Sequence, residues 1–250
     1  MRQPPLSSTI ERRLLVNYRV DPQAAARLLP APLRPQSVRG YAVAGICLLR
    51  LGSARPTWAP GSVGLRSENA AHRFAVEWDG PDGLETGVYI PRRDTASRLN
   101  TWAGGRLFPG EHHRAHFQVR ETSDELHLAY ATVDQTNRVD VAVTVTDELA
   151  GSELFADLQE ASDFFRQGAT GYSATAAGHH LDGMRLQTDT WKVAACRVRH
   201  GESTFFDDPS RFPSGSAVLD CAVLMRDTPV RWQPLPAITV GSDVSAGALL

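Results

Sequence analysis

The stretch Gly87-Val88-Tyr89-Ile90-Pro91-Arg92-Arg93-Asp94-Thr95-Ala96-Ser97 joins a short apolar strand to two arginines and an aspartate. Proline fixes φ and cannot donate to a strand ladder, so Pro91 indicates the end or the edge of a strand. Two neighbouring guanidiniums at a strand end predict a permanently charged anion site. The same residues also fit a solvated turn in which Arg92 and Arg93 have no function.

Strand patterns lie on both sides of this stretch. Residues 41–49 form a nearly continuous apolar run, which is typical of a strand covered on both faces. Valines alternate with other residues from 139 to 145, as in a half-buried antiparallel strand. The turn signal at 79–83 predicts a hairpin that leads into the central stretch. With these two included, the strands predicted outside the central stretch are 12–20, 40–51, 66–78, 112–120, 125–133, 137–146, 184–199 and 217–226.

Two segments carry helix signals. Asp21 suits an N-cap, Pro22 suits the first helical position, and Pro30 ends the short helix between them. Residues 152–167 predict a longer helix, capped by Ser152 and ended by a glycine. With about nine strands, few helices and no regular alternation of the two, the sequence predicts an α+β fold on a mostly antiparallel curved sheet or barrel.

Composition and charge restrict the class of protein. The chain has 250 residues, of which 42% are hydrophobic, and a net charge of −2. It can therefore bury a large core, and nothing in its charge favours nucleic acid or an anionic membrane as a partner. No apolar run approaches the roughly 20 residues that span a bilayer. The first ten residues lack the apolar stretch of a signal peptide, so we expect a cytoplasmic protein.

The three cysteines predict buried, reduced thiols. Cys47, Cys196 and Cys221 are odd in number, far apart and each in an apolar stretch, which disfavours a disulfide framework or a zinc site. Lys192 is the single lysine among 26 basic residues. Its side chain faces solvent or a pocket depending on the phase of its strand.

Several polar residues are candidates for a pocket. Glu68 and His72 share one face of the predicted strand 66–78 with apolar residues, so we expect both to line an interior or its mouth. His112 and His116 would share a face of a helix, which suits a metal, or of a strand, which suits a pocket wall or a wet outer face. The alternation that follows favours the strand, and we expect no metal.

Two motifs near the N-terminus point to a known family. Tyr18-Arg19-Val20-Asp21, followed by Leu28-Leu29-Pro30-Ala31-Pro32-Leu33, resembles the opening of the acetoacetate decarboxylase-like superfamily. Tyr89-Ile90-Pro91-Arg92-Arg93 is similar to that family's catalytic segment, in which proline precedes two lysines. Ser67-Glu68-Asn69 with Arg73, and the stretch 219–227, look more like an uncharacterised bacterial branch.

The resemblance implies one domain with a cone-like, mostly antiparallel β-barrel around a pocket. We place this domain at residues 12–233, between an N-terminal tail at 1–11 and a flexible C-terminal tail at 234–250. The superfamily often forms oligomers, so a homo-oligomer is also expected.

The family's chemistry does not transfer directly to this chain. In the decarboxylases the first lysine of the pair forms an imine with a β-keto acid. Arg92 stands at that position here, and a guanidinium cannot become the neutral nucleophilic amine. Two arginines can instead hold a carboxylate. We therefore expect an enzyme that acts on a carbonyl-containing organic acid by decarboxylation, dehydration or aldol chemistry, without a cofactor.

The expected site combines the arginine pair with nearby polar groups. The catalytic candidates are Glu68, Arg92, Arg93 and His116. The candidates for substrate binding are Arg19, His72, Tyr89, Arg92, Asp94 and Lys192. Two alternatives stay open: a non-catalytic protein that binds or senses a small organic acid, and imine chemistry at Lys192.

Overall fold

A computed structural model describes residues 4–60, 64–98, 108–175 and 178–240. Most of them lie in strands, and the predicted α+β fold built mainly on antiparallel strands is confirmed. The strands are β1 (Leu6–Val20), β2 (Arg34–Pro35), β3 (Ser37–Val38), β4 (Tyr41–Pro56), β5 (Leu65–Gly80), β6 (Gly83–Thr95), β7 (His112–Glu121), β8 (Glu125–Thr132), β9 (Arg138–Thr146), β10 (Thr170–Ala174), β11 (His180–Gln187), β12 (Ala194–Ser203) and β13 (Ala217–Thr239). The helices α1 and α3 span Pro22–Ala26 and Leu158–Gln167.

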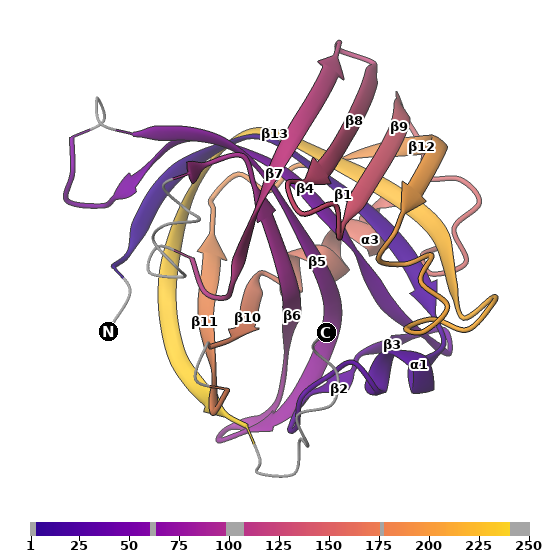
Figure 1. The fold of residues 1–250 in the computed structure, drawn as a ribbon, viewed down its shortest axis with the longest axis horizontal. Coiled ribbons are helices and arrows are strands. Elements are labelled where there is room, and N and C mark those ends of the chain that lie inside the picture. The colour runs from indigo at the N-terminus through magenta and orange to yellow at the C-terminus, as the bar shows by residue number, and fades with distance from the viewer. Residues whose placement is uncertain (1–3, 61–63, 99–107, 176–177, 241–250) are drawn as a thin grey trace.

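The strand pairing closes one large sheet into two rings. The first ring runs β1–β4–β5–β6–β10–β11–β13 and back to β1. The second ring uses β7, β8, β9 and β12 to connect β6 with β13. The rings share β1, β4, β5, β6 and β13, and β7–β9 with β12 stand on one side of these strands, whereas β10 and β11 stand on the other (Figure 1).

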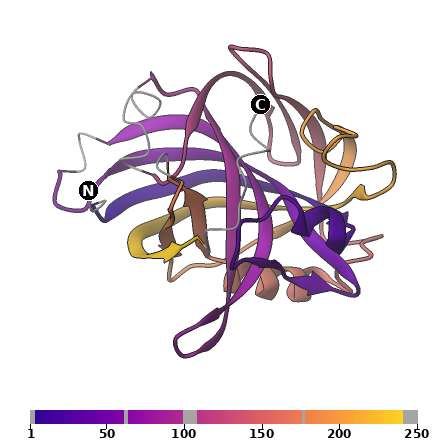
Figure 2. The same ribbon diagram turned by 60° about the horizontal axis from the view of Figure 1, so that its bottom comes forward.

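The two faces of the shared strands have different surroundings. One face packs into a core completed by the second ring, which includes Leu14, Leu48, Phe74 and Leu128. The other face packs against α3 through Cys47, Ala71 and Ala75. Figure 2 shows α3 lying beneath the strands. Because side chains alternate along a strand, each shared strand supplies both faces.

The element boundaries differ from the sequence expectation in two places. α3 begins after Asp157, whose side chain accepts from the Glu160 N–H at 2.8 Å, rather than at Ser152. Ser152 instead bonds Asp220 and caps a non-helical turn. The predicted strand 184–199 is two strands, because the chain passes at residues 188–193 from the first ring to the second.

Strands also extend beyond the expected domain limits. β1 begins at Leu6, and β13 continues to Thr239 because its second half pairs with β11. Residues 1–3 and 241–250 of the two expected tails lie outside the described residues. In the described part of the chain, no helix is both long and apolar enough to cross a membrane.

Candidate active site

The first ring encloses a cavity of about 90 Å³. Every strand of that ring contributes to the lining, together with β7 and the two residues that follow α3. The larger apolar side chains around it are Leu49, Leu51, Val88, Ile90, Phe108, Met184, Leu186 and Trp232. A mostly apolar lining with a few convergent polar groups is typical of a small-molecule site.

The cationic side chains of this lining are Arg13, Arg73 and Arg93. Arg73 projects from β5, donates from Nη2 to Oδ1 of Asn17, and holds its Cζ 4.9 Å from the centre of the Phe165 ring. Burial lowers the pKa of both Arg73 and Arg93 to about 10, so both guanidiniums stay charged at neutral pH.

These guanidiniums keep donors that nothing satisfies. Among the residues that the structure describes, no acceptor reaches Nη1 of Arg13 or Nε of Arg73 and Arg93. Burying a charged donor without a partner is unfavourable. The cavity is therefore suited to a small anion whose oxygens accept from these nitrogens.

Asp94 is the single acidic residue in the described lining, and its carboxylate already has hydrogen-bond donors outside the cavity arginines. It is fully buried and accepts from Nε of Arg92 at 3.1 Å, Oη of Tyr130 at 3.1 Å and Nδ2 of Asn137 at 2.8 Å. Burial raises the pKa of Asp94, and these donors oppose that shift. Because Asp94 is engaged in this way, the arginines of the cavity remain without a carboxylate.

A β-bulge in β6 decides which arginine reaches the cavity. His72 on β5 pairs with Arg92, but Phe74 pairs with Tyr89, so both Ile90 and Pro91 stand opposite one residue of β5. The extra residue inverts the alternation of side chains along the strand. Ile90 and then Arg93 therefore line the cavity, while Arg92 turns to Asp94 and to Thr136.

His112 borders the cavity at the start of β7. Its Nδ1 lies 3.2 Å from the carbonyl oxygen of Gly110, so a tautomer protonated at Nδ1 donates there and leaves Nε2 as an acceptor. Burial, and then the charge of Arg93, lower the pKa of His112 to about 4. The imidazole is therefore neutral at pH 7, and its Nε2 can accept a hydrogen bond from a bound ligand.

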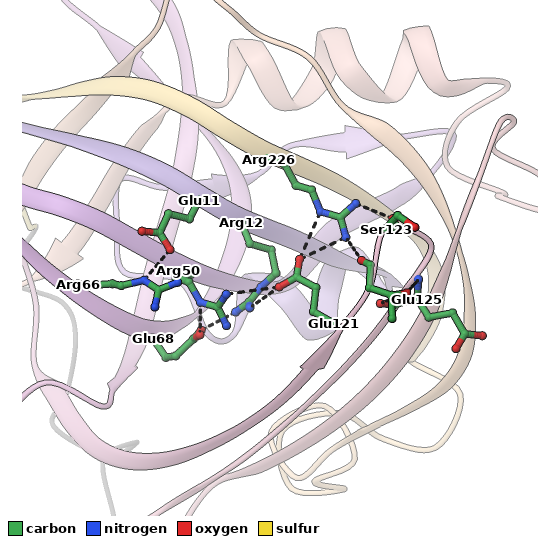
Figure 3. A network of polar contacts seen from close by, with 10 residues as sticks. Glu11, Arg12, Arg50, Arg66, Glu68, Glu121, Ser123, Glu125 and Arg226 are labelled. Atoms are coloured by element: carbon green, nitrogen blue, oxygen red, sulfur yellow. Dashed lines mark hydrogen bonds and ion pairs between the residues drawn. The ribbon is translucent and has the colours of Figure 1, made fainter.

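Glu68 lies on the other face of β5, in an ion-pair network that Figure 3 shows. It accepts from Nη2 of Arg12 and from Nε of Arg50, each at 2.5 Å. Glu121 of β7 contacts the same two arginines at 3.4 and 3.5 Å and also accepts from Arg226. The network ties β7 to β1, β4, β5 and β13, and it places Glu68 beside arginines that are not those of the cavity.

His72 and Tyr89 also lie on the second-ring side of the shared strands. His72 is fully buried, its ring centre is 4.4 Å from that of Phe205, and neither of its ring nitrogens has a hydrogen-bond partner among the described residues. Tyr89 belongs to the same core as Phe74 and Phe206, and burial raises its pKa. Both side chains are part of the packed interior and are separated from the cavity by the sheet.

His72 predicts a loss of stability in acid. Burial, then the charges of Arg92 and Arg211, lower its pKa from the usual 6.5 to about 3. Between these two values the unfolded chain binds a proton that the folded chain excludes, so stability falls as the pH falls below 6.5. From pH 7 to pH 5 this term removes about 2 kcal/mol. Urea unfolding of wild type and His72→Leu at both pH values measures it: the variant should lose less, and an equal loss would contradict the assignment.

The remaining sequence candidates lie elsewhere. Arg19, near the end of β1, pairs with Glu153 at 3.3 Å and with Asp220 at 3.7 Å. His116 is exposed on β7, and Lys192 is exposed on the connection between β11 and β12. Of all the predicted site residues, the described lining includes Arg93 and Asp94. Within the described residues, no group of three His, Cys, Asp or Glu side chains is arranged to hold a metal ion.

Residues 7–219 match the family DUF2071, which is described as an uncharacterized conserved protein. The chain belongs to this family. Comparison with the curated proteins found no match.

Solved structures show which fold this DUF2071 chain shares. The enduracididine biosynthesis enzyme MppR complexed with pyruvate is 15% identical, with a TM-score of 0.57 over 96% of this chain and 92% of that one. An acetoacetate decarboxylase from Legionella pneumophila is 10% identical, with a TM-score of 0.57 over 96% and 88%. An acetoacetate decarboxylase-like enzyme from Sphingomonas wittichii is 14% identical, with a TM-score of 0.55 over 96% and 94%. The predicted acetoacetate decarboxylase-like fold is confirmed.

Sequence reasoning did not select Arg13, Arg73 and His112 as site residues in this DUF2071 chain. A signal for Arg73 was present, since it interrupts an apolar strand in which an unpaired charge is costly. Arg13 carried no such signal. Arg12 beside it is equally basic, and only the direction in which each side chain leaves β1 decides which of the two reaches the cavity. His112 stood among the pocket candidates together with His116, and the structure places His112 alone at the cavity.

Proposed function

We propose that this chain is a small-molecule enzyme that binds a carbonyl-containing organic acid in the cavity of the first ring, without a Schiff base. One observation carries the proposal: three guanidiniums converge on an apolar cavity, and each has a buried nitrogen without a hydrogen-bond partner among the described residues. An organic acid offers the carboxylate that these donors lack and an apolar part that fits the remaining wall.

The position of the lysine supports a mechanism without an imine. Lys192 is the single lysine of the sequence, and its side chain is exposed on the connection between β11 and β12. Imine formation at a side chain of the cavity therefore has no amine available. The similarity to MppR, solved with pyruvate, supports a carbonyl acid as the ligand class.

The cavity can promote reactions at the carbon next to a carbonyl. Loss of a proton or of carbon dioxide from that carbon places negative charge on the carbonyl oxygen, and fixed guanidiniums stabilise that charge in a dry site. His112 borders the cavity with Nδ1 engaged by Gly110, so we assign its Nε2 as the group that moves the proton. Decarboxylation, dehydration and aldol chemistry all share this step. A protein that only binds the acid would need the arginines and no His112, so this histidine favours an enzyme.

The adjacent arginines offer a matched test of binding. Small keto and hydroxy acids, with their amides as neutral controls, are screened by thermal shift on wild type, Arg93→Met and Arg92→Met. An acid at about 100 times its Kd should raise the Tm of wild type by about 5–10 °C. Arg93→Met should lose this shift and Arg92→Met should keep it, because Arg92 lies on the other face of β6. Equal responses to acids and amides would contradict the proposal.

Turnover separates an enzyme from a binding protein. Acids that stabilise wild type are incubated with it in D₂O, and exchange of their α-protons is followed by NMR. Accelerated exchange that His112→Phe abolishes supports proton transfer at the cavity. Binding without exchange or consumption would instead establish a non-catalytic organic-acid binder.

A further inference from the structure

Cys47 is the cysteine that reaches the cavity. It lies on β4, is 8% exposed, and belongs to the cavity lining. Its neighbours across the sheet are Leu15 on β1 and Ala71 on β5. Neither neighbour carries a polar group, so the thiol borders the cavity without a polar side chain directly opposite it.

The three cavity arginines surround this thiol on the same face of the sheet. Arg13 pairs with Leu49, and Arg73 pairs with Gly45, so each stands one diagonal step from Cys47. Arg93 pairs with Ala71 and stands one strand further along. All three guanidiniums and the Cys47 thiol belong to the lining of the same cavity.

An unsatisfied buried donor marks this spot as a ligand site. Arg73 is 4% exposed, and among the described residues its Nε has no hydrogen-bond partner. A carboxylate bound there would place the carbon atoms of its acid near the Cys47 sulfur. Cationic neighbours are one of the features that accompany nucleophilic cysteines in proteins.

The other two cysteines have different surroundings. Burial raises the pKa of both Cys196 and Cys221 to about 12. Cys221 also contacts Asn17, whose Nδ2 lies 3.7 Å from its sulfur. Neither belongs to the described cavity lining, so the chain contains two internal controls for the behaviour of Cys47.

We propose that Cys47 is a nucleophile of the cavity, placed to attack an electrophilic carbon of an organic acid held by the arginines. This inference rests on the proposed function, because the arginines must first bind the acid. With a keto acid, a sulfur–carbon bond forms, the carbonyl double bond becomes single, and the thiol proton ends on the carbonyl oxygen. The product is a hemithioketal, and the step needs no oxidant or reductant.

Iodoacetate and iodoacetamide test this geometry as a pair of equally sized probes. Each forms a sulfur–carbon bond and releases iodide, and the thiol proton passes to buffer, but iodoacetate alone carries a carboxylate. Labelling of each cysteine is followed by peptide mass spectrometry on the native protein, with free cysteine as the reference thiol. Relative to that reference, Cys47 should prefer iodoacetate by about tenfold or more, because a cationic cleft concentrates anions. Cys196 and Cys221 should stay unlabelled until the protein unfolds.

Variants keep the two proposals separable. Arg93→Met should abolish the preference for iodoacetate while iodoacetamide still labels Cys47, and Cys47→Ala should keep the thermal shift with organic acids. If organic acids raise the Tm but neither reagent labels native Cys47, the nucleophile is overturned and the proposed function stands. If Cys47 is labelled with the preference of free cysteine and Arg93→Met changes nothing, anion capture fails and both proposals fall.

Discussion

Replacing Asp94 with alanine is expected to lower the free energy of unfolding by about 3–5 kcal/mol. The Asp94 carboxylate is fully buried and satisfies three donors at once, Nε of Arg92, Oη of Tyr130 and Nδ2 of Asn137. Alanine would leave the Arg92 charge without its counter-ion, and the two neutral donors would keep only the 2.9 Å bond that joins Asn137 to Tyr130. Loss of one partner from a buried pair costs more than the pair itself contributes, because the other charge stays desolvated.

Urea denaturation at pH 7 measures this effect. Asp94→Asn, which keeps an acceptor oxygen of the same size, should lose less than Asp94→Ala. Asp163→Ala serves as the surface control, because its pair with Arg166 on α3 is largely exposed and should contribute under about 1 kcal/mol. A loss for Asp94→Ala as small as that of the surface control would contradict the buried network.

Gly45→Ala is expected to destabilise the protein by about 3 kcal/mol or more, at the upper end of what overpacking costs. A Cβ at Gly45 would lie 2.3 Å from the backbone oxygen of Val16 and 3.3 Å from Oδ1 of Asn17. The first contact is with the backbone of β1, which cannot move without breaking its pairing with β4. The second contact is with the atom that accepts from Arg73, so the substitution also disturbs the cavity.

Gly168→Ala is the matched control for this substitution. Its Cβ would meet nothing closer than 3.7 Å, at the oxygen of Phe164, and its φ of −76° suits any residue. We expect its free energy of unfolding to stay within about 1 kcal/mol of wild type. Thermal and urea unfolding of both variants provide the comparison, and a Gly45→Ala protein as stable as Gly168→Ala would show that β1 and β4 are not packed as described.

Local chemistry predicted much of the fold. Asp21 and Pro22 begin α1 as expected, with the Asp21 side chain accepting from the Ala24 N–H at 2.8 Å. The alternation of valines from 139 to 145 corresponds to β9, where Val139, Val141 and Val143 are buried. These features depend on neighbouring residues alone, so a single sequence contains them.

Long-range pairing was beyond the reach of the same reasoning. The parallel contact of β10 with β6 joins Gly171 and Val88, which no local pattern connects. It is this contact, with that of β11 and β13, that closes the first ring and creates the cavity. The length of β13 has the same origin, because pairing with β11 overrides the prolines that indicate an end to the strand.

The sequence indicated part of the candidate site, and the rest depends on how the strands pair. The stretch around Pro91, which the sequence indicates as an anion site, contributes Arg93 and Asp94 to the cavity lining. The bulge at Ile90 and Pro91 depends on the register with β5, so the sequence could not show that Arg92 turns away. Glu68 and Arg73 lie on opposite faces of β5. The cavity is on the face that the first ring covers, which is the face of Arg73, and the sequence does not show which face that is.

Each shared strand carries cavity residues on one face and core residues on the other, so the two sets can change independently. On β4, Leu49 and Leu51 border the cavity, whereas Ile46 and Leu48 belong to the core of the second ring. Substitutions at the first pair would reshape the space for a ligand and leave the core that holds the rings together intact. Directed evolution could therefore randomise the cavity positions as a group while the intervening residues preserve the fold, which makes this architecture a scaffold for new ligand preferences.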